Sequence, residues 1–148
     1  APVSQMLDGE LELLAGAITK SPKTYCLWVH REWVVRALLA LGSDGLLAKE
    51  LGLCEQLLTA DERNFHCWAY RLALTALDQH PAHADLAFTT AKINTNFSNY
   101  SAWHYRSKAL TKLHTQRRAG GEESDFRAAV DTETQLVEGA VYTDPLDQ

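Results

Sequence analysis

Residues 62–71 read ERNFHCWAYR, and the same frame recurs at residues 22–31 (PKTYCLWVHR) and 97–106 (FSNYSAWHYR). The frame is a polar residue, an aromatic, two variable positions, Trp, two variable positions and Arg. We call it the signature. Its tryptophans, Trp28, Trp68 and Trp103, lie 40 and then 35 residues apart. This period is typical of repeats made of two helices, so the signature predicts an array of helical hairpins.

Each position of the signature suits the start of a helix. The polar residue can accept a hydrogen bond from a free backbone N–H and so cap the helix. The aromatic, Trp and Arg follow at intervals of three residues, which keeps them on one face. We expect the aromatics to wedge between neighbouring hairpins, and the arginines to donate to carbonyls or to a carboxylate of an adjacent repeat, since an unpaired buried charge is costly. The capping residues are Thr24, Asn64 and Asn99; the aromatics are Tyr25, Phe65 and Tyr100; the arginines are Arg31, Arg71 and Arg106.

Plainer amphipathic segments alternate with the signature segments. Apolar residues recur at helical spacing in four stripes, which begin at Leu7, Leu47, Leu86 and Phe126. The last stripe consists of Phe126, Val130, Val137 and Val141. No stretch alternates with a period of two, so no strand is expected. The pattern predicts an all-α protein of about seven helices, stacked as a solenoid of helical hairpins.

The repeats divide the chain into one predicted helical-repeat domain, residues 1–148. Signature repeats are expected near 22–58, 62–96 and 97–141, with a flexible linker near 115–124 that is charged and contains Gly120 and Gly121. An incomplete fourth repeat is expected to begin near residue 144, where Asp147 stands at the capping position and Gln148 at the aromatic position.

Composition excludes several classes of protein. The 148 residues are 46% hydrophobic and 22% charged, with a net charge of −5. No apolar run approaches the ~20 residues that a membrane span needs. The acidic balance disfavours nucleic acid as a partner, because nucleic-acid-binding proteins usually carry a basic surface. The three cysteines form no Cys-x-x-Cys pair, which favours reduced thiols and a cytoplasmic protein.

The signature, at this spacing, resembles the α-subunit repeat of protein prenyltransferases, most of all that of the Rab geranylgeranyltransferases (type II). Two stretches carry the resemblance, residues 60–68 (ADERNFHCW) and 96–106 (NFSNYSAWHYR), and residues 143–148 (TDPLDQ) resemble the opening of the next repeat. The resemblance covers roughly residues 5–148. It implies a right-handed α-α superhelix related to tetratricopeptide repeats. In the first repeat, Val29-His30 stands where the family usually has two histidines.

The resemblance also implies a role in prenyl transfer. The chain would be the α (non-zinc) subunit, or a fragment of it, of a heterodimer that transfers a prenyl group to C-terminal cysteines of Rab-type GTPases. It would hold no cofactor itself, because zinc and the isoprenoid pocket belong to the β subunit. A Rab escort protein is a possible further partner.

Particular residues take roles from this resemblance. Lys23 and Tyr25, in the Pro-Lys-x-Tyr motif, would lie on the side of the prenyl diphosphate. There the lysine would stabilise the charge that gathers on the leaving group. The residues expected at the subunit interface are Asn64, Phe65, His66, Asn99 and Tyr100. The signature tryptophans and arginines would be structural.

Two alternatives remain at this stage. One is a stand-alone helical-repeat scaffold that binds proteins without catalysis, and the other, less favoured by the acidic charge, is a helical-repeat reader of nucleic acid. Activity of the chain alone is not expected. The sequence has no Gly-x-x-x-x-Gly-Lys, Gly-x-Ser-x-Gly or His-Glu-x-x-His motif. The pair His80 and His83 lacks nearby Cys ligands, so no metal site is assigned.

Overall fold

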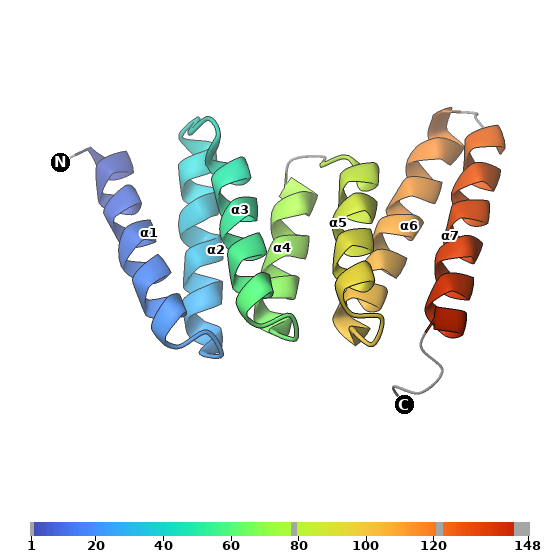
Figure 1. The fold of residues 1–148 in the computed structure, drawn as a ribbon. Coiled ribbons are helices and arrows are strands. Elements are labelled where there is room, and N and C mark those ends of the chain that lie inside the picture. Colours follow the sequence, from blue (N-terminus) through green and yellow to red (C-terminus); the bar gives the residue numbers. More distant parts are fainter. Residues whose placement is uncertain (1, 78–79, 121–122, 144–148) are drawn as a thin grey trace. The chain divides into compact units, whose positions relative to one another are not determined.

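The computed structural model describes residues 2–77, 80–120 and 123–143, and for 117–120, 123–126 and 143 it describes the backbone alone. These residues form helices and connecting turns without any β-strand (Figure 1). The helices within the described residues are α1 (Val3–Lys20), α2 (Tyr25–Ala40), α3 (Leu46–Ala60), α4 (Phe65–Leu77), α5 (Ala82–Thr95), α6 (Tyr100–Gly120) and α7 (Glu123–Thr143). The prediction of an all-α protein made of alternating plain and signature helices is confirmed.

The helices group into two compact units, residues 1–80 and 81–148. In the first unit α1 packs on α2, α3 on α4, and the two signature helices α2 and α4 on each other. In the second unit α6 packs on both α5 and α7. The stripes of α1 and α3 contribute Ile18, Cys54 and Leu58 to the core of the first unit, where α2 and α4 add residues that are equally buried, such as Leu38 and Leu74. Burying aliphatic side chains such as these is worth roughly 1.5–3 kcal/mol each, so this shared core stabilises the unit.

The signature tryptophans make one recurring contact that the sequence did not reveal. Each indole Nε1–H donates to the backbone carbonyl six residues earlier: Trp28 to Pro22 at 2.8 Å, Trp68 to Glu62 at 2.9 Å and Trp103 to Phe97 at 2.8 Å. The accepting residue lies in the turn that precedes the helix. A buried indole N–H requires such a partner, so the tryptophan fixes the turn to its own helix while its ring packs.

The signature aromatics do not wedge between hairpins. Tyr25, Phe65 and Tyr100 are 68%, 64% and 79% exposed. The expectation of burial is wrong because each aromatic is the first residue of its helix. A helical side chain leans toward the N-terminus of the helix, so the first one lies at the helix end, where few side chains cover it. The Trp, one turn later, is the residue that packs between helices.

Two further expectations need correction. Thr24 stands at the capping position of α2 but makes no capping hydrogen bond; its hydroxyl instead bonds that of Ser21 at 2.7 Å. The linker expected at 115–124 is helical through Gly120, because α6 continues that far and α7 begins at Glu123. The start of the fourth repeat, near residue 144, lies outside the described residues. None of the helices, over the residues described, is long and apolar enough to cross a membrane.

Candidate functional site

The turns that precede α2 and α4 lie at the same end of the first unit (Figure 1). The two turns have the same backbone form, since the N–H of Thr24 donates to Ser21 and that of Asn64 to Asp61, both at 3.2 Å. The candidate site residues of the first two repeats are in these turns or in the first turn of the helix that follows. Equivalent positions in the signature are therefore brought to one edge of the unit.

Asn64 anchors this edge. Its side-chain oxygen accepts the N–H groups of His66 at 3.1 Å and Cys67 at 3.3 Å, which caps α4. Its amide nitrogen donates to the carbonyl of Pro22 at 3.1 Å. Asn64 is only 2% exposed. It is therefore not available to a ligand in this unit, and its contribution is to hold the two turns together.

Lys23 extends into solvent from the first turn. Its side chain is 77% exposed, and its Nζ lies 3.7 Å from Oδ2 of Asp61 in the second turn. The other oxygen of Asp61 accepts the N–H of Arg63 at 3.1 Å, which fixes the orientation of the carboxylate. Sequence reasoning missed Asp61, although an acidic residue at the first position of a turn is a common signal. The exposed ammonium of Lys23 stands just before the N-terminus of α2, an end that favours anions.

Tyr25 and His66 meet beside this lysine-bearing turn. Their ring centroids are 5.8 Å apart, and His66 also contacts the ring of Phe65 with centroids 4.0 Å apart. Tyr25 and His66 belong to the lining of a shallow hollow of about 160 Å³ between α2 and α4, with Trp28, Val29, Glu32, Ala69 and Tyr70. The edge thus presents a phenol, an imidazole and an exposed ammonium, groups that can hydrogen-bond to an anionic oxygen.

A buried ion pair is linked to the hollow through Tyr70, which lines the hollow and contacts Glu50. Arg31 donates from Nε and Nη2 to the two carboxylate oxygens of Glu50 at 2.8 and 2.7 Å, and from Nη1 to the carbonyl of Leu11 at 2.8 Å. Tyr70 donates its hydroxyl to Glu50 at 2.7 Å. The cluster joins α1, α2, α3 and α4. The sequence does carry a signal for Glu50, because it lies three residues after Leu47 on the apolar stripe of α3, where only a paired carboxylate is stable.

The cluster shifts two pKa values. Burial lowers the pKa of the Arg31 guanidinium, but the hydrogen bonds and charge of Glu50 outweigh it and leave that pKa above its ordinary value. Burial and the charge of Glu50, which also accepts the phenol hydrogen bond, raise the pKa of Tyr70. Tyr70 therefore stays neutral and donates. These groups are structural, since Arg31 and Glu50 are 3% and 1% exposed.

The third signature lies in the second unit. Asn99 caps α6, where its side-chain oxygen accepts the N–H of Ala102 at 3.0 Å. Tyr100 is exposed and stacks on His104 with ring centroids 6.1 Å apart. Arg106 donates to Glu133 of α7 and to the carbonyl of Leu86. Among the described residues, no three His, Cys, Asp or Glu side chains are grouped so that they could hold a metal ion.

The fold and this edge define a class of protein, a helical-repeat protein in which every second helix carries the signature. The sequence profile described as "Protein prenyltransferase alpha subunit repeat" matches residues 7–38, 47–77 and 82–113. The chain belongs to this family. The matches pair α1 with α2, α3 with α4 and α5 with α6, so each repeat of the family begins at the plain helix and not, as predicted above, at the signature helix.

Individual relatives have one name in common. The chain is 40% identical over 146 residues to the geranylgeranyl transferase type-2 subunit alpha of Bos taurus, a match that covers 99% of this chain and 25% of the relative. The identity to the subunit of the same name from Homo sapiens is 39% over 146 residues, with the same coverage. For that of Saccharomyces cerevisiae it is 32%, covering 95% of this chain and 43% of the relative. The chain therefore spans about a quarter of the length of the mammalian relatives that it matches.

Proposed function

We propose that this chain is part of the α subunit of a heterodimeric protein geranylgeranyltransferase of type II. The observation that carries the proposal is the edge formed by the turns before α2 and α4, where Tyr25 and His66 meet and Lys23 is exposed. The family membership and the name shared by the relatives support it. The β subunit of the heterodimer would pack against this edge.

Lys23 would act on the leaving group of the reaction. In the complete enzyme, the reacting group would be a cysteine thiolate of the protein substrate, activated by zinc bound in the β subunit. The ammonium of Lys23 would then reach across the subunit boundary and neutralise charge on the departing diphosphate. Tyr25 would donate a hydrogen bond to the same group. Within the described residues, the contact that holds the exposed side chain of Lys23 is the one with Asp61 at 3.7 Å, which is weak enough for the ammonium to turn toward a diphosphate.

The interface residues would have different tasks. Phe65 is 64% exposed and would bury its ring against the β subunit, with His66 beside it. Asn64 would act indirectly, because it is buried and positions the two turns. The protein substrate would be a Rab-type GTPase, presented by a Rab escort protein, and the enzyme would work in the cytoplasm.

The decisive experiment compares lysine variants in the assembled enzyme. The complete polypeptide that contains this chain is co-expressed with the β subunit, and single-turnover geranylgeranyl transfer to a Rab-type GTPase is measured. Lys23→Ala is expected to slow the transfer at least about 10-fold, the scale for losing one cation at a developing charge. The matched control is Lys49→Ala, because Lys49 is an exposed lysine of α3 away from the edge. Its rate should stay within about 2-fold of wild type.

Two outcomes would contradict the proposal. Equal rates for Lys23→Ala and wild type would remove the lysine from the mechanism. Failure of the polypeptide to co-purify with a β subunit, with no rise in melting temperature on mixing, would favour the stand-alone scaffold instead. The isolated chain is expected to have no transferase activity.

A further inference from the structure

Two cysteine side chains meet in the core of the first unit. Cys54 belongs to α3 and Cys67 to α4, and both are 0% exposed. The thiol of Cys67 donates to the backbone carbonyl of Cys54 at 3.6 Å. The thiol of Cys54 is also hydrogen-bonded to that of Cys67. The two thiols therefore face each other across the contact between α3 and α4.

Hydrogen bonds on both sides of this thiol pair fix the helices that carry it. One turn away along both helices, Tyr70 of α4 donates its hydroxyl to Glu50 of α3 at 2.7 Å. On the other side, the backbone N–H of Cys67 donates at 3.3 Å to the side-chain oxygen of Asn64, the cap of α4. Sulfur atoms joined by a disulfide are about 2.05 Å apart. A bond between the two thiols would therefore draw the first turn of α4 toward α3.

The same two positions hold no sulfur in the other repeats. Shifting the cysteines by the 40 and 35 residues that separate the signature tryptophans gives Leu14 and Leu27 in the first repeat, and Thr89 and Ala102 in the third. Leu14, Thr89 and Ala102 are at most 3% exposed, so these positions are buried with side chains that do not react with oxidants. Packing at this point of a repeat therefore does not require a thiol.

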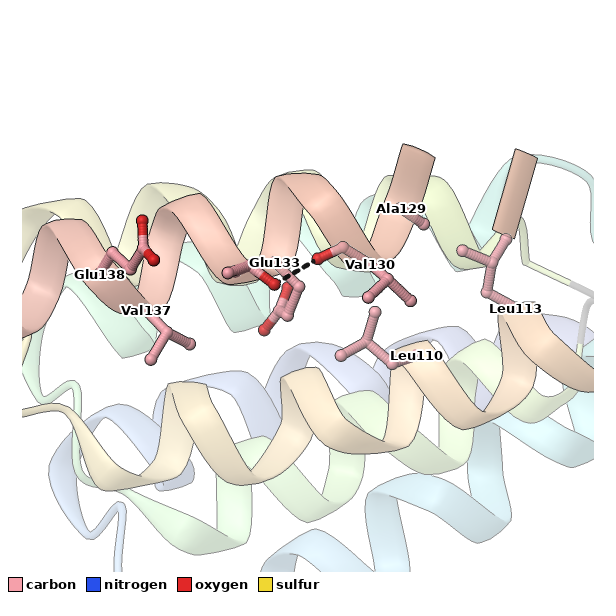
Figure 2. Close-up of a pocket in the computed structure, with 8 residues that line it drawn as sticks. Leu110, Leu113, Ala129, Val130, Glu133, Val137 and Glu138 are labelled. Atoms are coloured by element: carbon pink, nitrogen blue, oxygen red, sulfur yellow. Dashed lines mark hydrogen bonds between the residues drawn. The ribbon is translucent and has the colours of Figure 1, made fainter. Parts of the chain in front are cut away.

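Paired helices of this chain also meet through aliphatic side chains. In the second unit, Leu110 of α6 and Val130 of α7 point toward each other across an apolar groove (Figure 2). Methyl groups make the same dispersion contacts as a thiol, but they do not undergo thiol–disulfide exchange. The thiols between α3 and α4 thus add a reactivity that the fold itself does not need.

In the closed unit both thiols are protected from reaction. The reactive form of a cysteine is the thiolate. The hydrogen bond with Cys67 and burial raise the pKa of the Cys54 thiol, which keeps it protonated. Because both side chains are shielded from solvent, an oxidant reaches them when α3 and α4 separate locally. The rate of oxidation therefore depends on the opening of this helix pair.

We propose that Cys54 and Cys67 are a redox-sensitive thiol pair, which a low-molecular-weight disulfide such as glutathione disulfide converts into a disulfide between α3 and α4. The disulfide draws the first turn of α4 toward α3. This movement displaces the cap Asn64 and, next to Cys67, the ring of His66 at the edge of the unit. The inference concerns the first unit and does not rest on prenyl transfer.

The reaction takes place in two exchange steps. In the opened unit, the thiolate of one cysteine attacks a sulfur atom of glutathione disulfide, and one glutathione thiolate leaves. The thiolate of the other cysteine then attacks the protein sulfur of the mixed disulfide, and the second glutathione thiolate leaves. The two protein thiols lose two electrons and two protons, and glutathione disulfide becomes two molecules of glutathione.

The test treats the reduced chain with mixtures of glutathione disulfide and glutathione in the absence of denaturant. The chain carries Cys26→Ser, which removes the exposed thiol. After quenching with acid and alkylation of the remaining thiols, mass spectrometry should find a peptide that links Cys54 to Cys67. This product should exceed the mixed disulfide with glutathione at least about 10-fold, because the second thiol is held at a high effective concentration. In NMR spectra, the imidazole signal of His66 should shift on oxidation, whereas that of His104 in the second unit should stay in place.

Matched variants separate the thiol pair from other effects of the treatment. Cys54→Ala and Cys67→Ala are each made in the Cys26→Ser background. Ala102 occupies the position of Cys67 in the third repeat, so Cys67→Ala is a substitution that this fold accommodates. Under the same treatment neither variant should give a linked peptide or a shift of the His66 signal. Circular dichroism of each variant before treatment establishes that it is folded.

Three results would overturn the proposal. The first is a linked peptide that forms in concentrated urea but at no glutathione ratio without urea, which would make the cysteines packing residues alone. The second is a mixed disulfide with glutathione as the main product, which would show that the two sulfur atoms do not reach each other. The third is a disulfide that leaves the His66 signal unchanged, which would separate the thiol pair from the edge.

Discussion

The side-chain amide of Asn64 donates to the backbone carbonyl of Pro22 at 3.1 Å, across 42 residues of sequence. The same carbonyl accepts the indole N–H of Trp28 at 2.8 Å. Asn64 also caps its own helix through the N–H groups of His66 and Cys67. One buried side chain therefore joins the turn before α2 to the turn before α4. The relative placement of Lys23, Tyr25 and His66 depends on this link.

Asn64→Ala should lower the free energy of unfolding by about 2–3 kcal/mol, because it removes a cap and leaves buried groups without partners. Asn64→Asp keeps the cap but sets a buried carboxylate oxygen against the carbonyl oxygen of Pro22, so it should also destabilise the fold, by at least about 2 kcal/mol. Urea denaturation followed by circular dichroism measures both. Thr24→Ala is the control, since Thr24 makes no capping bond, and it should stay within about 0.5 kcal/mol of wild type. A larger loss for Thr24→Ala than for Asn64→Ala would contradict this account.

Two ion pairs of equal length should differ widely in their effect on stability. Arg31–Glu50 and Arg36–Glu32 both measure 2.7 Å. The first is buried, whereas Arg36 and Glu32 are 50% and 31% exposed. Glu50→Gln leaves the buried guanidinium uncompensated and should cost about 3 kcal/mol. Glu32→Gln should cost less than about 0.5 kcal/mol. Urea denaturation of both variants tests the comparison, and similar losses would mean that burial does not decide the effect.

The stability of the chain should fall at high pH through Tyr70. Burial and the charge of Glu50 raise the pKa of this phenol in the folded state, while its pKa in the unfolded chain is about 10. Because the pKa is higher in the folded state than in the unfolded chain, the contribution of Tyr70 to the free energy of unfolding is fully present below pH ~10. It is lost as the pH rises above that value. The loss is about 1.4 kcal/mol per pH unit, because only the unfolded state releases the proton.

Unfolding measured between pH 8 and pH 11.5 tests this effect as a difference between wild type and Tyr70→Phe. The free-energy advantage of wild type should be constant up to pH ~10 and then shrink with the stated slope. Tyr142→Phe serves as the control, since Tyr142 is 80% exposed and should show no such change. A difference between wild type and Tyr70→Phe that stays constant to pH 11.5 would show that the phenol titrates normally.

The helices could be predicted from the sequence, because the helical spacing of apolar residues and the recurrence of Trp28, Trp68 and Trp103 can be recognised without knowledge of tertiary contacts. The exposure of Tyr25 could not be obtained from spacing alone. Residues three apart share a helical face, but only the position of the helix end decides whether the first of them meets a neighbour. The bond from Asn64 to Pro22 depends on two turns meeting in space. The spacing of residues along the chain does not show that these two turns come into contact, so the hydrogen bond could not be predicted from it.

Asp61→Asn tests whether the negative charge of Asp61 weakens the binding of anions to Lys23 in the assembled enzyme. Asn keeps the side-chain oxygen that accepts the N–H of Arg63, so the turn should persist, while the negative charge 3.7 Å from the lysine Nζ disappears. If Lys23 reaches the diphosphate as proposed, inhibition by inorganic diphosphate should become up to about 5-fold tighter, the scale of an exposed pair. This gain should fade at high salt, because exposed charges are screened. Asp44→Asn, in the turn before α3, should leave the inhibition constant unchanged. Equal inhibition constants for Asp61→Asn and wild type at low salt would mean that the lysine and the diphosphate do not interact.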